Sequence, residues 1–300
     1  MSLLRRDERT AYPILVPILL IIAVFVYFPA LITLWRSFNA VTLGLNADEH
    51  FVGVANYAKL LTPGSTFWSS FWITAQIVAI TLPLELVIGT AGALLLNHSF
   101  RGRGAVRVIA MLPWMLPPIV NGFMWNWVLN GDFGALNGLL YQLGFIKEYQ
   151  YWLQAPSSQL FWVAIAQSWT RYAFVMLILL AGLQSIAVEI YDAAKVDGAG
   201  PIATFTRITL PHLLPTFAIV LAIELISSIQ VFDLIWSITS GGGAGGQINP
   251  FTKVLMVSNY QVVFRNLDLG LGGALSYLIL LVSLGGAALF VRNLYKRVTL

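Results

Sequence analysis

The chain has 300 residues, of which 58% are hydrophobic and 10% are charged, and its net charge is +4. Soluble domains carry roughly 25% charged residues, so the composition excludes a water-soluble fold of this length and favours an integral membrane protein. The basic residues form no stripe with interleaved aromatics, which argues against nucleic acid, and zero cysteines with three isolated histidines predict no metal site and no cofactor on this chain.

Uncharged stretches of about 20 residues, the length that crosses the hydrocarbon core, predict the transmembrane helices. The first such stretch follows Arg5, Arg6 and Arg9, but it is too long for a signal peptide and no small-x-small cleavage site follows it, so we expect an uncleaved span. Segments 46–63 and 241–250 are rich in Gly, Pro, Asn and charge and are typical of loops. The six predicted spans are 12–35, 68–96, 108–129, 159–183, 213–237 and 269–291.

The distribution of basic residues predicts the orientation of these spans. With alternate loops on alternate sides, 11 of the 17 Lys and Arg residues lie on one side and 5 on the other, with Arg171 inside a span. The positive-inside rule then places both termini in the cytoplasm. We therefore expect an all-α polytopic protein with a cytoplasmic N-terminus at 1–11, a single transmembrane domain at 12–294 and a cytoplasmic C-terminus at 295–300.

Four charged residues fall within the predicted spans, where each costs about 3 kcal/mol at the bilayer centre. Glu85 lies in the second span, Arg171 in the fourth, and Glu224 and Asp233 in the fifth. One interpretation is that Arg171 pairs with Glu224 or Glu85 merely to neutralise buried charge. The other is that these groups line the path of a polar, uncharged solute.

Further polar groups accompany the charges in the fifth span. Glu224, Ser227, Ser228 and Val231 follow the i, i+3, i+4, i+7 spacing and would share one helix face. Together with arginine, these groups supply the donors and acceptors that sugar hydroxyls need. Aromatic side chains in segment 169–174 would either stack on a sugar ring or serve in packing. The predicted substrate path comprises Arg171, Phe174, Glu224, Ser227, Ser228, Gln230 and Asp233.

The predicted cytoplasmic loop between the fourth and fifth spans contains a short helix at 189–197. Acidic residues near its start suit the macrodipole, and Gly198 ends it at a position that tolerates positive φ. Pro211 suits the first turn of the fifth span. Ala193 and Ala194 leave a bare patch against which another protein could pack, although an ordinary amphipathic connector has the same pattern.

This loop resembles that of the membrane subunits of ATP-binding-cassette importers, in particular the carbohydrate-uptake permeases of the maltose and glycerol-phosphate type. Those permeases carry Glu-Ala-Ala, three residues and Gly, followed by Ile-x-Leu-Pro; this chain has Asp192-Ala-Ala-Lys-Val-Asp-Gly198 and Ile208-Thr-Leu-Pro211. Segments 180–186 and 232–242 are similar to the same family, and the likeness spans most of the chain. The departures are Asp192 for the leading Glu, Gly241-Gly242-Gly243 for Gly-Gly-Pro, and Arg171 at a normally small position before Tyr172, so the family's substrates do not carry over directly to this chain.

The resemblance implies a type I importer permease fold, in a bacterial or archaeal plasma (inner) membrane. It implies import of a carbohydrate, either a di- or oligosaccharide or a related polyol or sugar phosphate, by alternating access. The implied partners are a second homologous permease subunit in a heterodimer, two copies of a cytoplasmic ATPase that holds ATP and Mg, and an external solute-binding protein. The loop 187–211 would couple to the ATPase. The implied coupling residues are Tyr191, Asp192, Ala193, Ala194, Asp197, Gly198 and Ala199.

Two other function classes were weighed against this one. An enzyme is not expected, because no lysine follows a glycine as a phosphate-binding loop requires, and no nucleophile and base pair is evident. The alternative is an ion- or proton-coupled secondary carrier in which Glu85, Arg171, Glu224 and Asp233 form a relay. The six spans show no inverted repeat, which argues against that carrier.

Overall fold

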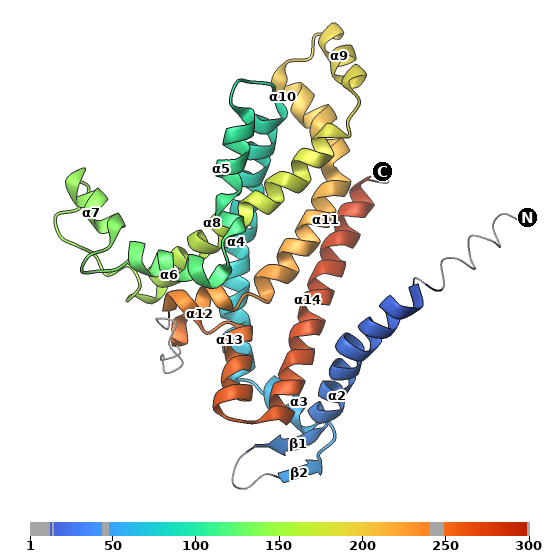
Figure 1. Cartoon of the computed structure of the whole chain (residues 1–300), viewed down its shortest axis with the longest axis vertical. Helices are drawn as coiled ribbons and strands as arrows, with labels where there is room; N and C mark the ends of the chain where they lie inside the picture. The colour runs from blue at the N-terminus through green and yellow to red at the C-terminus, as the bar shows by residue number, and fades with distance from the viewer. Residues whose placement is uncertain (1–12, 14, 44–47, 240–248, 299–300) are drawn as a thin grey trace, which may run out of the picture. The chain divides into compact units, whose positions relative to one another are not determined.

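The computed structural model describes residues 13, 15–43, 48–239 and 249–298, and they fall into two compact units (Figure 1). The first unit comprises residues up to Trp68 together with Asn259–Leu278. The second comprises Ser69–Ser258 and the residues from Ile279 onward. The predicted N-terminus at 1–11, the last two residues (299–300) of the predicted C-terminus at 295–300, and the glycines Gly241 to Gly243 lie outside the described residues.

The first unit contains one long apolar helix, a β-hairpin and a short helix. The helix Leu15–Ser37 includes a π-helical turn, and β1 pairs antiparallel with β2 so that Asn39 lies opposite Phe51. The segment predicted as a loop at 46–63 therefore contains a strand and a helix. The elements are η1 (Ala23–Tyr27), α2 (Phe28–Ser37), β1 (Asn39–Thr42), β2 (Asp48–Phe51), α3 (Ala55–Leu61), η4 (Gln261–Arg265) and the start of α14 (Leu269–Val298).

Side-chain hydrogen bonds to the backbone hold the hairpin to the end of α2. Asn56 Nδ2 donates to the carbonyl oxygens of Ser37 at 3.0 Å and Asn39 at 2.9 Å. Ser37 Oγ lies 2.7 Å from the Tyr57 hydroxyl. These bonds satisfy carbonyl groups that the end of a helix leaves without partners, which accounts for the ordered structure of this segment.

The second unit is a helical bundle centred on α8, the most deeply buried of the long helices in the described chain. Its apolar core joins α4, α8 and α11 through residues such as Leu96, Met176 and Leu213. The elements are α4 (Thr66–Asn97), α5 (Arg103–Met115), α6 (Pro118–Val128), α7 (Ala135–Gln142), α8 (Pro156–Gln184), α9 (Val188–Val196), α10 (Pro201–Thr204), η2 (Phe205–Thr209), α11 (Leu210–Ile229), α12 (Asp233–Thr239), η3 (Pro250–Thr252), α13 (Leu255–Tyr260) and the rest of α14.

Two glycines allow α4 and α8 to approach closely. A Cβ added to Gly89 would lie 2.5 Å from Cγ1 of Val175, and one added to Gly92 would lie 2.9 Å from Sδ of Met176. Small residues at such contacts let helix backbones pack directly in a membrane. The contact fixes which turns of α4 and α8 face each other.

The third predicted span is wrong as a continuous helix. The chain bends by 94° between α5 and α6. Leu116 and Pro117 have extended backbone, with ψ of 139° and 136°, because a residue before proline avoids the helical region and neither Pro117 nor Pro118 has an N–H to donate. Asn121 Nδ2 donates to the Pro113 carbonyl at 2.9 Å across the bend and so satisfies one exposed acceptor.

The fifth predicted span is wrong in both bounds. The helix runs continuously over Pro201–Ile229 rather than over 213–237. It ends at Gln230, whose φ of −94° and ψ of 9° leave the helical region. A separate helix, α12, starts at Asp233, where a carboxylate in the first turn suits the macrodipole. Val231 and Asp233 therefore do not continue the face that carries Glu224.

The remaining spans and the all-helical class are confirmed. The long apolar helices Leu15–Ser37, Thr66–Asn97, Pro156–Gln184 and Leu269–Arg292 correspond to the first, second, fourth and sixth predictions. Pro201–Ile229 is a fifth, and the bent pair α5 and α6 would make a sixth within the described residues. The orientation of the termini stays a prediction.

Candidate functional site

An ion pair between α8 and α11 lies at the centre of the candidate site. Arg171 Nε donates to Glu224 Oε2 at 2.9 Å, and Nη2 donates to Oε1 at 3.1 Å. The same Nη2 donates to Ser227 Oγ at 3.1 Å. This two-bond geometry is the strongest that a guanidinium makes with a carboxylate. The Glu224 side chain is 0% exposed and that of Arg171 is 23% exposed, so the arginine balances a fully buried charge.

The other side of the guanidinium faces an aromatic surface. Arg171 Cζ lies 5.4 Å from the centroid of the Phe174 ring, within the range of a cation–π contact. The Trp114 ring on α5 lies 5.8 Å from that of Phe174, and the rings of Trp125 and Trp169 meet edge to face at 5.8 Å. A charged donor and the rings of Phe174 and Trp114 therefore lie together.

Glu85 on α4 is a second buried carboxylate near this pair. Its side chain is fully buried, and neither oxygen has a hydrogen-bond partner in the described part of the chain. Glu224 and Arg171 are the charges that act on it. One turn earlier, Thr81 Oγ1 is also buried and has no hydrogen-bond partner among the described residues. Thr81 was not among the predicted site residues, although its i, i+4 spacing to Glu85 places both on one helix face.

The structure brings together only part of the predicted substrate path. Ser227 joins the ion pair, while Ser228 is buried and its Oγ lacks a partner among the described residues. Gln230 and Asp233 are exposed and lie beyond the end of α11. Placing Asp233 inside a span was therefore wrong, because α12 begins at that residue.

The predicted short helix is present as α9, over Val188–Val196. Asp197 is its C-terminal cap, and Gly198 has a φ of 74°. The backbone N–H of Ala199 donates to the Ala194 carbonyl at 2.9 Å, which is a capping bond of the kind that a left-handed glycine permits. Figure 1 shows α9 at the same end of the second unit as α10 and the loop that joins α4 to α5.

The surface of α9 differs from the predicted bare alanine patch. Ala193 is exposed, but Ala194 is buried against its own chain, because it faces the core rather than the outside. Larger apolar side chains are exposed instead, including Val188 and Val196, of which the latter is 88% exposed. Exposed apolar side chains on a loop mark a surface that another protein can cover.

Two other residues of the predicted coupling set, Tyr191 and Asp192, contact neighbouring side chains. The Tyr191 hydroxyl lies 3.3 Å from Thr209 Oγ1, at the end of the π-helical turn that leads into α11. Lys195 Nζ donates to Asp192 Oδ1 at 2.8 Å in an exposed pair, which contributes little to stability. The Tyr191 contact thus connects the short helix directly to the helix that carries Glu224.

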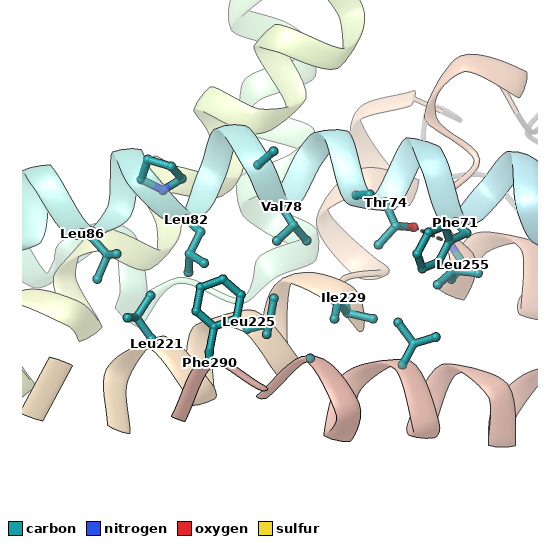
Figure 2. Close-up of a pocket in the computed structure, with 15 residues that line it drawn as sticks. Phe71, Thr74, Val78, Leu82, Leu86, Leu221, Leu225, Ile229, Leu255 and Phe290 are labelled. Carbon is teal, nitrogen blue, oxygen red and sulfur yellow. Dashed lines mark hydrogen bonds between the residues drawn. The ribbon is translucent and has the colours of Figure 1, made fainter. Parts of the chain in front are cut away.

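A large cavity in the second unit is not a candidate sugar site. It has a volume of about 650 Å³ and lies among α4, α11 and α14 (Figure 2). Its walls are almost entirely apolar, with side chains such as Val78, Leu82, Leu225 and Phe290 pointing into it. A carbohydrate bound there would leave its hydroxyls without partners, at a cost of a few kcal/mol each.

A smaller, more polar pocket of about 250 Å³ lies in the segment between α6 and α8. The Tyr151 hydroxyl donates to Asp132 Oδ1 at 2.8 Å, and this hydrogen bond raises the pKa of Tyr151 above its ordinary value. Buried Asn137 holds the segment together: its Nδ2 donates to the Gln150 carbonyl at 2.9 Å, and its Oδ1 accepts from Trp152 Nε1 at 3.0 Å. The sequence analysis did not identify this pocket, because Asp132 and Tyr151 are far apart in the chain.

Comparison with known proteins places this arrangement among membrane transport proteins. Residues 85–299 match the family described as binding-protein-dependent transport system inner membrane component. The chain is 34% identical over 288 residues to the trehalose/maltose transport system permease protein MalF of Thermococcus litoralis, covering 96% of this chain and 94% of that protein. It is 32% identical to the sulfoquinovosyl glycerol transport system permease protein SmoG of Agrobacterium fabrum, covering 95% and 90%.

A solved structure has the same fold. It belongs to a bacterial ABC transporter involved in the import of the acidic polysaccharide alginate. The TM-score is 0.81 at 23% identity, and the match covers 100% of both chains.

Proposed function

Since the chain belongs to the family of inner membrane components of binding-protein-dependent transport systems, we propose that it is the membrane-spanning subunit of an ATP-driven carbohydrate importer. It is a multi-pass protein of the inner membrane. Relatives named for trehalose/maltose and sulfoquinovosyl glycerol transport support a sugar or sugar derivative as the substrate. The chain itself would carry no ATP-hydrolysing site and would bind neither ATP nor Mg.

The arrangement of Arg171, Glu224 and Phe174 carries the substrate part of the proposal. A guanidinium has five N–H donors, and three hydrogen bonds hold its Nε and Nη2 atoms in place. The Nη1 atom makes no hydrogen bond within the described chain, and the side chain is 23% exposed. A sugar hydroxyl could accept from Nη1 while the ring packs on Phe174.

The loop that carries α9 supports the coupling part. We place a cytoplasmic ATPase against the exposed face formed by Val188, Asp192, Ala193 and Val196. The ATPase would act on α11 through the contact between Tyr191 and Thr209, and so shift the subunit between inward-open and outward-facing states. The complete transporter would pair this chain with a second homologous permease subunit, two ATPase copies and an external solute-binding protein.

A conservative aromatic substitution tests the substrate site. Phe174→Leu removes the ring and keeps an apolar side chain. We expect the sugar concentration for half-maximal uptake to rise about two- to tenfold, since a stacking contact contributes about 0.5–1.5 kcal/mol. Phe161→Leu changes an exposed phenylalanine on the same helix and should leave uptake unchanged. The measurement is uptake by the complex reconstituted in liposomes. Equal behaviour of the two variants would contradict the assignment.

The coupling assignment is tested separately with Gly198→Asp. The left-handed φ of this residue favours glycine, and the new carboxylate would lie on the face proposed to meet the ATPase, so the variant should retain ATP hydrolysis and lose most uptake. Normal uptake per ATP hydrolysed would show that the loop does not couple the two activities.

The unpartnered Glu85 carboxyl favours the alternative function, an ion- or proton-coupled carrier. Liposomes distinguish the two mechanisms directly. Uptake that requires ATP and persists when a protonophore collapses the proton gradient supports the importer. Uptake driven by the gradient without ATP supports the carrier.

A further inference from the structure

Two neighbouring cavities in the second unit lie beside α4, and we call them together the α4 groove. The first, of about 610 Å³, lies where the end of α4 meets the loop that carries α9. The second, of about 410 Å³, runs along α4 beside α11. Leu94 and Phe205 line both cavities. The two cavities therefore adjoin at these two side chains, and their walls differ in chemistry.

The arm of the groove along α4 is apolar. It follows Leu86, Val87, Thr90 and Leu94, which lie on one stripe of the helix, and Phe217 of α11 closes it on the other side. From Leu86 to Leu94 the helix rises about 12 Å. One leaflet of the hydrocarbon core is about 15 Å thick, half of the total. The arm thus extends through most of one leaflet.

The end of the groove beyond Leu94 is polar and basic. Asn97 and His98 line it, and their side chains make no hydrogen bond within the described chain. Lys195 also lines it, and its ammonium gives one of three donors to exposed Asp192. This end lies on the side that holds 11 of the 17 basic residues, the predicted cytoplasmic side. An anion at the membrane surface would find free donors here.

We propose that the α4 groove binds an anionic phospholipid of the cytoplasmic leaflet. The phosphate would lie at His98 and Lys195, and one acyl chain would follow α4 from Leu94 towards Leu86. A free phosphate compound would leave the apolar arm empty, and an apolar protein segment would bring no anion to the basic end. A phospholipid supplies both parts with the spacing that the groove has.

Occupation of this site would act on the loop that carries α9. Lys195 belongs to α9, and Thr204 and Thr209, which also line the polar end, belong to the segment between α9 and α11. A bound lipid would favour the arrangement of the loop seen here, because the lipid would bind this arrangement more tightly than other arrangements of the loop. This regulatory consequence rests on the proposed coupling function. The lipid site itself does not.

Lipid binding can be measured without any transport assay, so its failure is distinguishable from failure of the proposed function. The purified full-length chain is delipidated and titrated by native mass spectrometry with phosphatidylglycerol, phosphatidylcholine of the same acyl chains, and glycerol 3-phosphate. We expect phosphatidylglycerol to bind at least about tenfold more tightly than either of the others, because the choline cation of phosphatidylcholine offsets the attraction of its phosphate to Lys195, and glycerol 3-phosphate has no acyl chain for the apolar arm.

Matched variants locate the two parts of the lipid. Lys195→Gln combined with His98→Gln should remove the preference for phosphatidylglycerol, whereas Arg207→Gln, an exposed basic residue outside the groove, should retain it. Ala91→Phe, which fills the apolar arm, should weaken binding of both phospholipids about tenfold. Leu95→Phe, on the same helix but outside the groove, should not.

A label on the unaltered chain covers the case in which a variant fails to fold. Phosphatidylglycerol with a photoreactive acyl chain should label peptides from 86–94 and 205–217. Three results would overturn the proposal. They are labelling confined to other segments, equal affinity for the two phospholipids, and equal effects of the Lys195→Gln/His98→Gln double variant and of Arg207→Gln. Cross-linking of Ala91→Cys, the sole cysteine of that variant, to another polypeptide in the membrane would also overturn it, because the groove would then be a subunit interface.

Discussion

The ion pair between α8 and α11 provides a quantitative test of the site, because its two partners differ in burial. Arg171→Met leaves the carboxylate of Glu224 fully buried without a counter-charge. Removing one partner of a buried pair costs about 3–5 kcal/mol, and the 0% exposure of Glu224 places this variant in that range. Glu224→Met leaves a guanidinium that is 23% exposed and still bonded to Ser227. We expect about 1–3 kcal/mol for this second variant, the cost of an unsatisfied polar group.

The double variant distinguishes pairing from independent effects. Replacing a buried ion pair by two apolar side chains of similar volume is often nearly neutral, so Arg171→Met with Glu224→Met should be more stable than Arg171→Met alone. The resulting coupling free energy should be at least about 2 kcal/mol. Free energies of unfolding are measured in mixed micelles from tryptophan fluorescence, with exposed Lys147→Met as a control that should change stability by less than about 0.5 kcal/mol. Additive effects of the two single substitutions would refute the reasoning.

Three further predictions concern backbone packing, the turn after α9 and the segment between α6 and α8. Gly89→Val would place a Cβ 2.5 Å from Cγ1 of Val175 on α8, so it should lower the free energy of unfolding by about 1–3 kcal/mol. Gly285→Ala would place a Cβ with no atom within 4 Å and should have no such effect in the same unfolding assay. Gly198→Ala should cost about 1–2 kcal/mol because its φ is 74°, and Gly198→Asn should cost less by the same measurement; equal costs would contradict the role of backbone strain. The raised pKa of Tyr151 means that its hydrogen bond to Asp132 stabilises the fold below the ordinary tyrosine pKa of 10.0, and that this stabilisation is lost as the pH rises through the raised pKa. In an absorbance titration of tyrosinate, Asp132→Asn should return the pKa of Tyr151 to its ordinary range. An unchanged titration would exclude the hydrogen bond.

The sequence predicted the uninterrupted spans because apolar length alone identifies them. It did not predict the 94° bend between α5 and α6, since the residues on both sides of the bend are equally apolar. The signal was present in Pro117 and Pro118, which cannot donate backbone hydrogen bonds. The start of the fifth helix at Pro201 was missed for a related reason, because its polar first turns lie outside any apolar window.

The site was predictable in its residue types but not in its pairing. Arg171 could have bound Glu85 or Glu224, and sequence spacing does not decide between carboxylates on two different helices. In the structure Arg171 binds Glu224, and Glu85 is left without a hydrogen bond in the described chain. Gln230 and Asp233 were included on the assumption of a continuous helix, which the break after Ile229 removes.

Because the helix is continuous from Pro201 to Ile229, a rotation of its first turns also moves the residues near its other end. Thr209, which touches α9 through Tyr191, and Glu224, which holds Arg171, are 15 residues apart, or about 22 Å along the axis. A tilt of about 5° about the end near Thr209 would displace Glu224 by about 2 Å over that length. The hydrogen bonds of the ion pair are 2.9 and 3.1 Å long, so such a displacement would break them. A small rotation imposed at one membrane surface is thus sufficient to open a polar contact deep inside the bundle.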